Sequence, residues 1–148
     1  MISLLKLGRE KRFIWIINGF LYLTTGCSGF PPDHIGSFAP CSNKPNCVST
    51  KTTSRQHWIK PLKYDDSMET AKERLFQVIS EMPRTRLVTN KEDYMHVEFT
   101  SKIMRFVDDV EFYFNDPGLI SFRSASRLGY SDMGVNRERM EKIRNFSY

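Results

Sequence analysis

The spacing of apolar residues along the chain changes from a helical period to a strand period at Pro83. Upstream of this proline, apolar residues recur every three or four positions, and the cap-forming segment Asp65–Glu69 precedes them. The recurring residues are Met68, Ala71, Leu75, Val78, Ile79 and Met82. This pattern predicts an amphipathic helix from Met68 to about Glu81, in which the methionines fill the core.

Downstream of Pro83, apolar and polar residues alternate, which is typical of half-buried strands. The alternating segments are Thr85–Thr89, Tyr94–Thr100, Asp109–Phe114 and Leu119–Ala125, with Ile103–Val107 expected to prolong the second one past a kink. Polar turn residues separate these segments at 90–93 and 115–118. We therefore expect a meander of four antiparallel strands.

A second helix is expected near the C-terminal end. Asn136 can cap a helix from Arg137 to Asn145 that carries the apolar residues Met140, Ile143 and Phe146. The elements together predict an α+β fold, in which a mostly antiparallel sheet of about four strands has both helices packed on one face. Pro61 interrupts the apolar segment 57–62, so we expect an edge strand there at most.

The first 26 residues have the pattern of an export signal. A basic start that ends at Arg12 precedes the apolar stretch Phe13–Leu23, which has the length of a signal-peptide core and is too short to span a bilayer. Small residues then lead to Cys27, which is similar to a bacterial lipobox, although Thr24 stands where leucine is expected. We expect cleavage before Cys27 and acylation of this cysteine. The alternatives are an uncleaved N-terminal anchor and a buried helix.

Residues 27–40 are rich in glycine and proline, which predicts a tether between the membrane and a single domain at 41–148. His34 lies in the tether and has no expected role. Ser28 follows the cysteine, and this resembles the outer-membrane sorting pattern of lipoproteins in Gram-negative bacteria. The sequence thus predicts a lipoprotein of the cell envelope that faces the periplasm, at the outer membrane rather than the inner one.

Cys41 and Cys47 form a C-x5-C pair once Cys27 is assigned to lipid. Two remaining cysteines in an oxidising compartment predict a disulfide. A metal site made of both cysteines and His57 lacks a fourth ligand and the short spacing of zinc sites. We therefore expect a disulfide and no metal.

The net charge of +5 comes mainly from the two ends of the chain, 1–26 and 122–148. Such local basicity argues against a protein that coats nucleic acid. The sequence also has no glycine-rich phosphate loop, and we expect neither a nucleic-acid partner nor a cofactor.

The densest group of polar residues lies in the segment 122–144. Its arginines have planar guanidinium groups that suit carboxylate or phosphate. We predict one site for an anionic small molecule, formed by Arg123, Arg127, Tyr130, Asp132, Asn136 and Arg137 with Asp108 and Asp109 of a neighbouring strand. The other interpretation, which we favour slightly, is an ion-pair network that ties the loop containing Gly129 and Gly134 to the sheet.

Acid–base chemistry is an alternative for the acidic residues. Asp108 and Asp109, with Glu111 two positions on, can act as a carboxylate pair. Since Asp109 and Glu111 share one strand face, they can equally pair with Arg123 and Arg127 across the hairpin. The pattern favours a binding or structural module over an enzyme. The alternative is a hydrolase or other enzyme that uses Asp108, Asp109 and the polar cluster Arg123–Arg137.

Three segments carry a family resemblance: PCSNKPNCVST at 40–50, FVDDVEFYF at 106–114 and RSASRLGYSDMGVNRERMEKIR at 123–144. In this order they are similar to the bacterial and plastid family called domain of unknown function 1499 (DUF1499), from about Cys41 to the C-terminus. The resemblance implies no catalytic residue, because no biochemical role is established for the family.

Overall fold

The computed structural model of this protein describes residues 37–147. The expected signal peptide, the acylation site Cys27 and most of the tether, including His34, lie outside the described residues.

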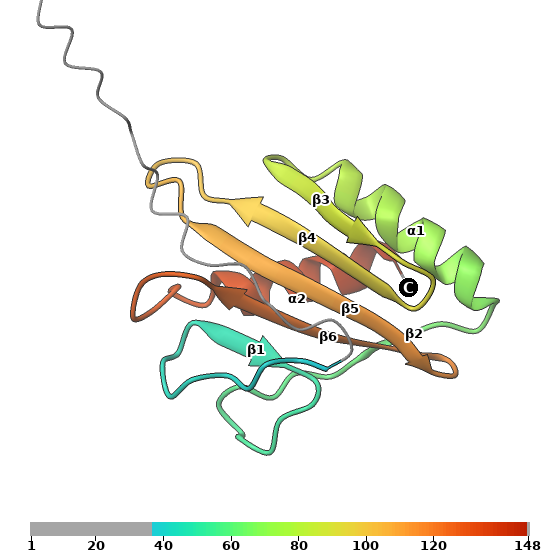
Figure 1. The fold of residues 1–148 in the computed structure, drawn as a ribbon, viewed down its shortest axis with the longest axis horizontal. Coiled ribbons are helices and arrows are strands. Elements are labelled where there is room, and N and C mark those ends of the chain that lie inside the picture. Colours follow the sequence, from blue (N-terminus) through green and yellow to red (C-terminus); the bar gives the residue numbers. More distant parts are fainter. Residues whose placement is uncertain (1–36, 148) are drawn as a thin grey trace, which may run out of the picture.

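The described residues form a six-stranded antiparallel sheet with two helices, which confirms the expected α+β class. The strands are β1 (Cys47–Ser49), β2 (Leu62–Lys63), β3 (Thr85–Asn90), β4 (Tyr94–Thr100), β5 (Val107–Asp116) and β6 (Leu119–Ser126). The helices are α1 (Met68–Ser80) and α2 (Val135–Ser147). The strand order is β1-β6-β5-β4-β3, and β2 pairs with the same edge of the sheet as β1, along β6. The meander β3 to β6 is therefore confirmed, and two short strands extend it (Figure 1).

Both helices contribute to one core on a single face of the sheet. Ala71, Leu75 and Ile79 of α1 are buried, as their helical spacing predicts, and so are Met140 and Ile143 of α2. Every second residue of the central strands joins this core, including Met95, Val97 and Phe99 of β4 and Val110 and Phe112 of β5. Figure 1 shows α2 behind β5 and β6, and α1 packs against α2.

The structure corrects two expected elements. Residues 101–106 form a loop and do not prolong β4; the N–H of Ser101 donates to the carbonyl of Phe106 at 2.8 Å and closes the loop. Asn136 lies inside α2 and is not its cap. The cap acceptor is instead Asp132, whose carboxylate receives the N–H groups of Gly134 and Asn136 at 3.0 and 2.8 Å.

In the cysteine loop, Cys41 and Cys47 are joined by a disulfide. The second cysteine begins β1, a strand that the sequence pattern did not predict. In the segment 57–62, the structure has an isolated bridge between Ser49 and Trp58 and the beginning of β2. None of the helices in the described part of the chain is long and apolar enough to cross a membrane.

Candidate functional site

Strands β4, β5 and β6 place polar residues side by side on the sheet face opposite the helices. Strand pairing sets His96 opposite Glu111, Glu98 opposite Asp109, and Glu111 opposite Arg123. We call this surface the polar face; its residues on these strands are Tyr94, His96, Glu98, Asp109, Glu111, Tyr113, Ser121 and Arg123. All of them except Arg123 are buried, and Glu111 is 0% exposed. Buried charges of this kind need partners, because each one is removed from water.

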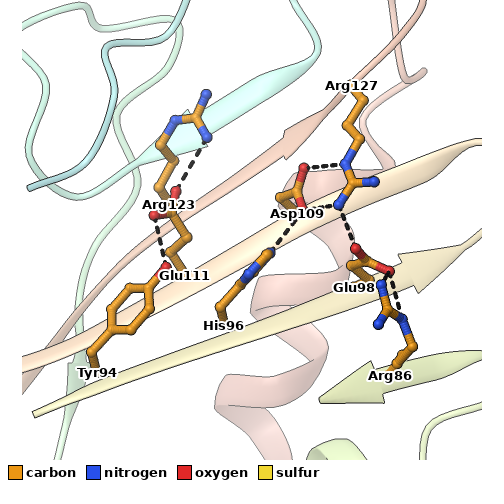
Figure 2. Close-up of polar contacts among 8 residues, drawn as sticks. All are labelled: Arg86, Tyr94, His96, Glu98, Asp109, Glu111, Arg123 and Arg127. Carbon is orange, nitrogen blue, oxygen red and sulfur yellow. Dashed lines mark hydrogen bonds and ion pairs between the residues drawn. The ribbon is translucent and has the colours of Figure 1, made fainter. Parts of the chain in front are cut away.

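One group of partners surrounds Arg127, which directly follows β6 (Figure 2). Its guanidinium donates to both carboxylate oxygens of Asp109 and to Glu98, and Arg86 of β3 donates to the other oxygen of Glu98. His96 contacts Asp109 through Nε2, 2.7 Å from Oδ1. The result is a chain of alternating positive and negative groups across three strands.

These contacts set the protonation of the carboxylate in the middle. Burial by itself raises the pKa of Asp109, but hydrogen bonds from His96 and Arg127 outweigh burial and hold the pKa below its ordinary value. The hydrogen bond to Asp109 in turn raises the pKa of Arg127. Asp109 is therefore an ionised partner of Arg127 at neutral pH, and not a proton donor.

A second group on the polar face consists of Tyr94, Glu111 and Arg123 (Figure 2). The Tyr94 hydroxyl lies 3.1 Å from one oxygen of Glu111, and Nη1 of Arg123 lies 3.4 Å from the other. Burial raises the pKa of Glu111 despite the positive charge of Arg123, and burial together with the charge of Glu111 raises the pKa of Tyr94. The buried Nε of Arg123 has no hydrogen-bond partner. Arg123 is therefore far less well paired than Arg127.

A third group lies on the helix side of the sheet, around Asn136 of α2. Its side-chain oxygen accepts from Ser124 and Arg139, and its nitrogen donates to Ser126, Asp132 and the carbonyl of Asn46. Asp108 joins this group by accepting from Ser126 and Arg139. Asn136 therefore connects β6, the loop before β1 and the start of α2.

The sheet thus separates the eight residues for which we predicted one site. Arg123, Arg127 and Asp109 lie on the polar face; Asp108, Asp132 and Asn136 lie in the group around α2; Tyr130 is exposed, and Arg137 donates to the carbonyls of Gln56 and Trp58. The reason is the two-residue period of a strand, which turns Asp108 and Asp109 to opposite faces. For the same reason these two carboxylates do not face one substrate together.

Arg137, in the first turn of α2, forms an ion pair with neither Asp108 nor Asp109. Its Nη2 is 3.1 Å from the carbonyl oxygen of Gln56 and 2.9 Å from that of Trp58. Backbone carbonyls of the segment between β1 and β2 therefore hold this arginine in place.

Most residues of the polar face were not among the eight predicted site residues, and neither was Arg86, which contacts Glu98. The missed residues of the face are Tyr94, His96, Glu98, Glu111, Tyr113 and Ser121. The alternation in β4 placed Tyr94, His96 and Glu98 on one face, but it does not show that this face is buried. Within residues 37–147, no group of three or more His, Cys, Asp or Glu side chains is placed to hold a metal ion.

A hollow of about 340 Å³ lies further along the polar face, beyond Arg123. Its lining includes Phe38, Lys51, Tyr113, Asp116 and Ser121. Phe38 packs edge-on against Tyr113 with ring centroids 4.9 Å apart, and Lys51 pairs with Asp116 at 2.7 Å. Ser121 and Arg123 are on the same face of β6, so the arginine lies next to this hollow.

The family model described as "Protein of unknown function (DUF1499)" matches residues 37–146. The chain belongs to the DUF1499 family. The match covers every strand and nearly all of α2, so the polar face and the group around Asn136 are both parts of the DUF1499 domain. No curated protein matches the sequence.

Proposed function

We propose that this DUF1499 protein is an exported, membrane-tethered module of the cell envelope that binds a small anion, with Arg123 as the anion-binding residue. The observation that carries the anion site is the incomplete pairing of Arg123. Its side chain is 14% exposed, its Nε is buried without a partner, and its single contact with Glu111 is long at 3.4 Å. A guanidinium has five N–H donors, so this one retains donors for a carboxylate or phosphate.

The surroundings of Arg123 support a small ligand. Lys51 follows β1 and lies near Ser121, because Thr50 pairs with Phe122 through its backbone N–H at 3.0 Å. Lys51 and its partner Asp116 are both substantially exposed, so their ion pair is weak and can open for a ligand. Arg123, Lys51 and Ser121 thus offer two positive charges and a hydroxyl beside a hollow that is walled by Phe38 and Tyr113.

Arg127 has a different role in this proposal. Its donors are directed to Asp109 and Glu98, and all three side chains are buried. We assign this group to holding β4, β5 and β6 together at the end of the sheet away from the hollow. The enzyme alternative stays a prediction.

The anion site is tested by thermal unfolding with succinate, acetate and phosphate, each compared with chloride at equal ionic strength. A ligand that binds only the folded state stabilises it by about 2.7 kcal/mol at 100 times its Kd. We expect one of these anions to raise the Tm of the wild type and to lose this effect in Arg123→Ala. The matched control is Arg55→Ala, at an exposed arginine between β1 and β2, which should respond as the wild type does. Equal responses of Arg123→Ala and wild type would overturn the anion site.

The tether is tested separately at Cys27, whose acylation the N-terminal pattern predicts. Cys27→Ser should leave the precursor uncleaved, and mass spectrometry of the wild-type membrane form should find a chain that begins at an acylated Cys27. An intact Met1 in that form would overturn the lipoprotein part of the proposal and leave the anion site to its own test.

A further inference from the structure

Exposed apolar side chains gather at one end of the sheet. In the described part of the chain, six of the exposed large apolar residues come from two loops and the residue that follows the second: Ile103, Met104, Leu128, Tyr130, Met133 and Val135. They include the two most exposed ones, Met133 at 96% and Ile103 at 85%. The remaining exposed apolar residues, such as Trp58, Phe76 and Leu87, are scattered over other elements. Clustering of this kind marks an interaction surface, whereas single exposed apolar residues do not.

The two loops lie side by side because of the strand order. Loop 101–106 joins β4 to β5, and loop 127–134 follows β6, which is paired with β5. The N–H of Arg127 donates to the carbonyl of Val107 at 3.0 Å, so the second loop begins where the first one ends. Figure 1 shows both loops at the same end of the sheet. We call these two loops, together with Val135, the loop end.

The backbone holds the apolar side chains outward. Arg105 and Met133 have φ values of 57° and 55°, which side chains other than glycine adopt only at an energetic cost. Gly129 and Gly134, with φ of 93° and 85°, turn the second loop on either side of Tyr130 and Met133. The turns thus give the loop end a defined backbone conformation, from which the exposed side chains of Tyr130 and Met133 project.

Charge at the loop end is positive. Lys102 and Arg105 flank Ile103 and Met104 and are exposed. Asp132 is the acidic residue of the two loops, and its carboxylate is occupied by the N–H groups that it caps and by Asn136. Apolar tips flanked by free cationic side chains complement a bilayer interface that carries anionic headgroups. Tyr130 fits the same place, since its ring is apolar and its hydroxyl is polar.

The predicted tether limits how far the domain can be from the membrane. Ten residues lead from Cys27 to Ser37, where the described domain begins, and a fully extended chain spans at most about 3.3–3.6 Å per residue. The domain would thus remain within about 36 Å of the acyl chains, which is about the size of the domain itself. The proposed tether therefore keeps the domain close enough to the bilayer for its surface to reach the headgroups.

We propose that the loop end docks onto the anionic lipid surface to which the chain is tethered, with Ile103, Met104, Tyr130 and Met133 in the interface and Lys102 and Arg105 on the headgroups. This inference rests on the tether of the proposed function. Docking fixes the orientation of the domain, and it leaves the hollow beside Arg123 open to the surrounding solution, since that hollow lies toward the opposite ends of β5 and β6.

The test uses the full chain on vesicles of phosphatidylcholine with phosphatidylglycerol, treated with dilute hydrogen peroxide. Peptide mass spectrometry then measures sulfoxide formation at Met104 and Met133, two exposed methionines that oxidise readily when they face water. We expect oxidation about tenfold slower than on vesicles of phosphatidylcholine alone, which corresponds to about 1.4 kcal/mol in favour of docking. Lys102→Glu/Arg105→Glu should abolish this protection. Lys60→Glu/Lys63→Glu, a matched charge change at exposed lysines elsewhere, should retain it.

Each outcome has a separate meaning. A chain that sediments with the vesicles but is oxidised equally fast on both lipids overturns the docking and leaves the tether standing. A chain that does not sediment with vesicles overturns the tether and the docking together. Methionines that react freely on vesicles but are protected in isolated envelopes show a protein partner at the loop end, which overturns the lipid assignment.

Discussion

Arg127 meets Asp109 side-on, with Nε 2.7 Å from Oδ2 and Nη2 2.7 Å from Oδ1. Two parallel hydrogen bonds are the strongest arrangement available to an arginine and a carboxylate. Because both side chains are buried, neither charge can return to water when the other is removed. The pair thus makes β6 and β5 interdependent at the end where loop 127–134 begins.

Arg127→Ala should lower the free energy of unfolding by about 3–5 kcal/mol, because it leaves Asp109 and Glu98 buried without their main partner. Arg86→Ala is the matched control: Arg86 also pairs with Glu98, but its side chain is 68% exposed, and we expect a loss below about 1 kcal/mol. Urea unfolding at pH 7 measures both values. Equal losses in the two variants would contradict the structural role assigned to Arg127.

Glu111 should make stability depend on pH in a direction opposite to Asp109. Burial raises the pKa of Glu111, so the folded state keeps this proton at pH values where the unfolded chain has lost it. Wild-type stability should therefore fall as pH rises from about 4.3, the ordinary glutamate value, to the folded pKa. Glu111→Gln has no such proton and should gain stability relative to wild type over that range, as measured by urea unfolding at successive pH values.

Asp109→Asn provides the comparison of opposite sign. The pKa of Asp109 is lowered, so its contribution is present above about 3.9 and is lost as pH falls through the folded pKa. Asp109→Asn should therefore lose stability relative to wild type as pH rises from the acid side.

The outcome that contradicts the Glu111 prediction is a pH profile of Glu111→Gln that runs parallel to that of the wild type. Such a result would show that Glu111 is not buried as described.

Asn136→Ala should destabilise the protein by about 2–4 kcal/mol, because several buried partners each lose a hydrogen bond with a net value near 1 kcal/mol. Asn145→Ala lies in the same helix at an exposed position and should change stability by less than about 0.5 kcal/mol. Thermal unfolding followed by circular dichroism compares the two. A small effect at Asn136 would mean that its partners find other hydrogen bonds.

Loss of the disulfide should have a moderate effect. The Cys41–Cys47 bridge closes a loop with a sequence separation of 6, and the loop-entropy model assigns about 2 kcal/mol to a ring of this size. Cys41→Ser/Cys47→Ser should therefore fold, with a free energy of unfolding, measured by urea denaturation, that is lower by about 2 kcal/mol. A variant that fails to fold would show that the bridge positions β1 as well as restricting the unfolded chain.

The sequence pattern was sufficient to predict the elements in which a helical or strand period continues over many residues. The helical spacing from Met68 to Met82 and the alternation after Thr85 predicted α1 and the meander β3 to β6. β1 has only three residues, too few to show a period, and its pairing with β6 is a tertiary contact. The turn before α2 was misassigned because both Asp132 and Asn136 are residue types that cap helices, and only the backbone shows which one does.

The sequence allowed the ion pairs of the candidate site to be predicted, but not which of its residues lie on the same face of the sheet. The shared strand face of Asp109 and Glu111 allowed their pairing with Arg127 and Arg123, and the structure contains both ion pairs. Segment 122–144 is continuous in sequence, but a sheet and a helix start divide it between two faces. His96 and Glu98 are buried. The alternation in β4 does not predict this, because their burial depends on the segments that cover this face of the sheet.

The pairing of β1 with β6 also dictates when the domain can finish folding. β1 is the first strand in the chain and β6 the last, so Val48 meets Ser124 only after almost the whole sequence is present. Contacts between such distant segments slow folding, because a long loop must close before they form. If the chain is exported as proposed, β1 crosses the membrane before β6 and has no strand partner until β6 follows. The edge of β6 that β1 and β2 occupy is therefore completed by segments that precede β6 in the chain and must wait for it.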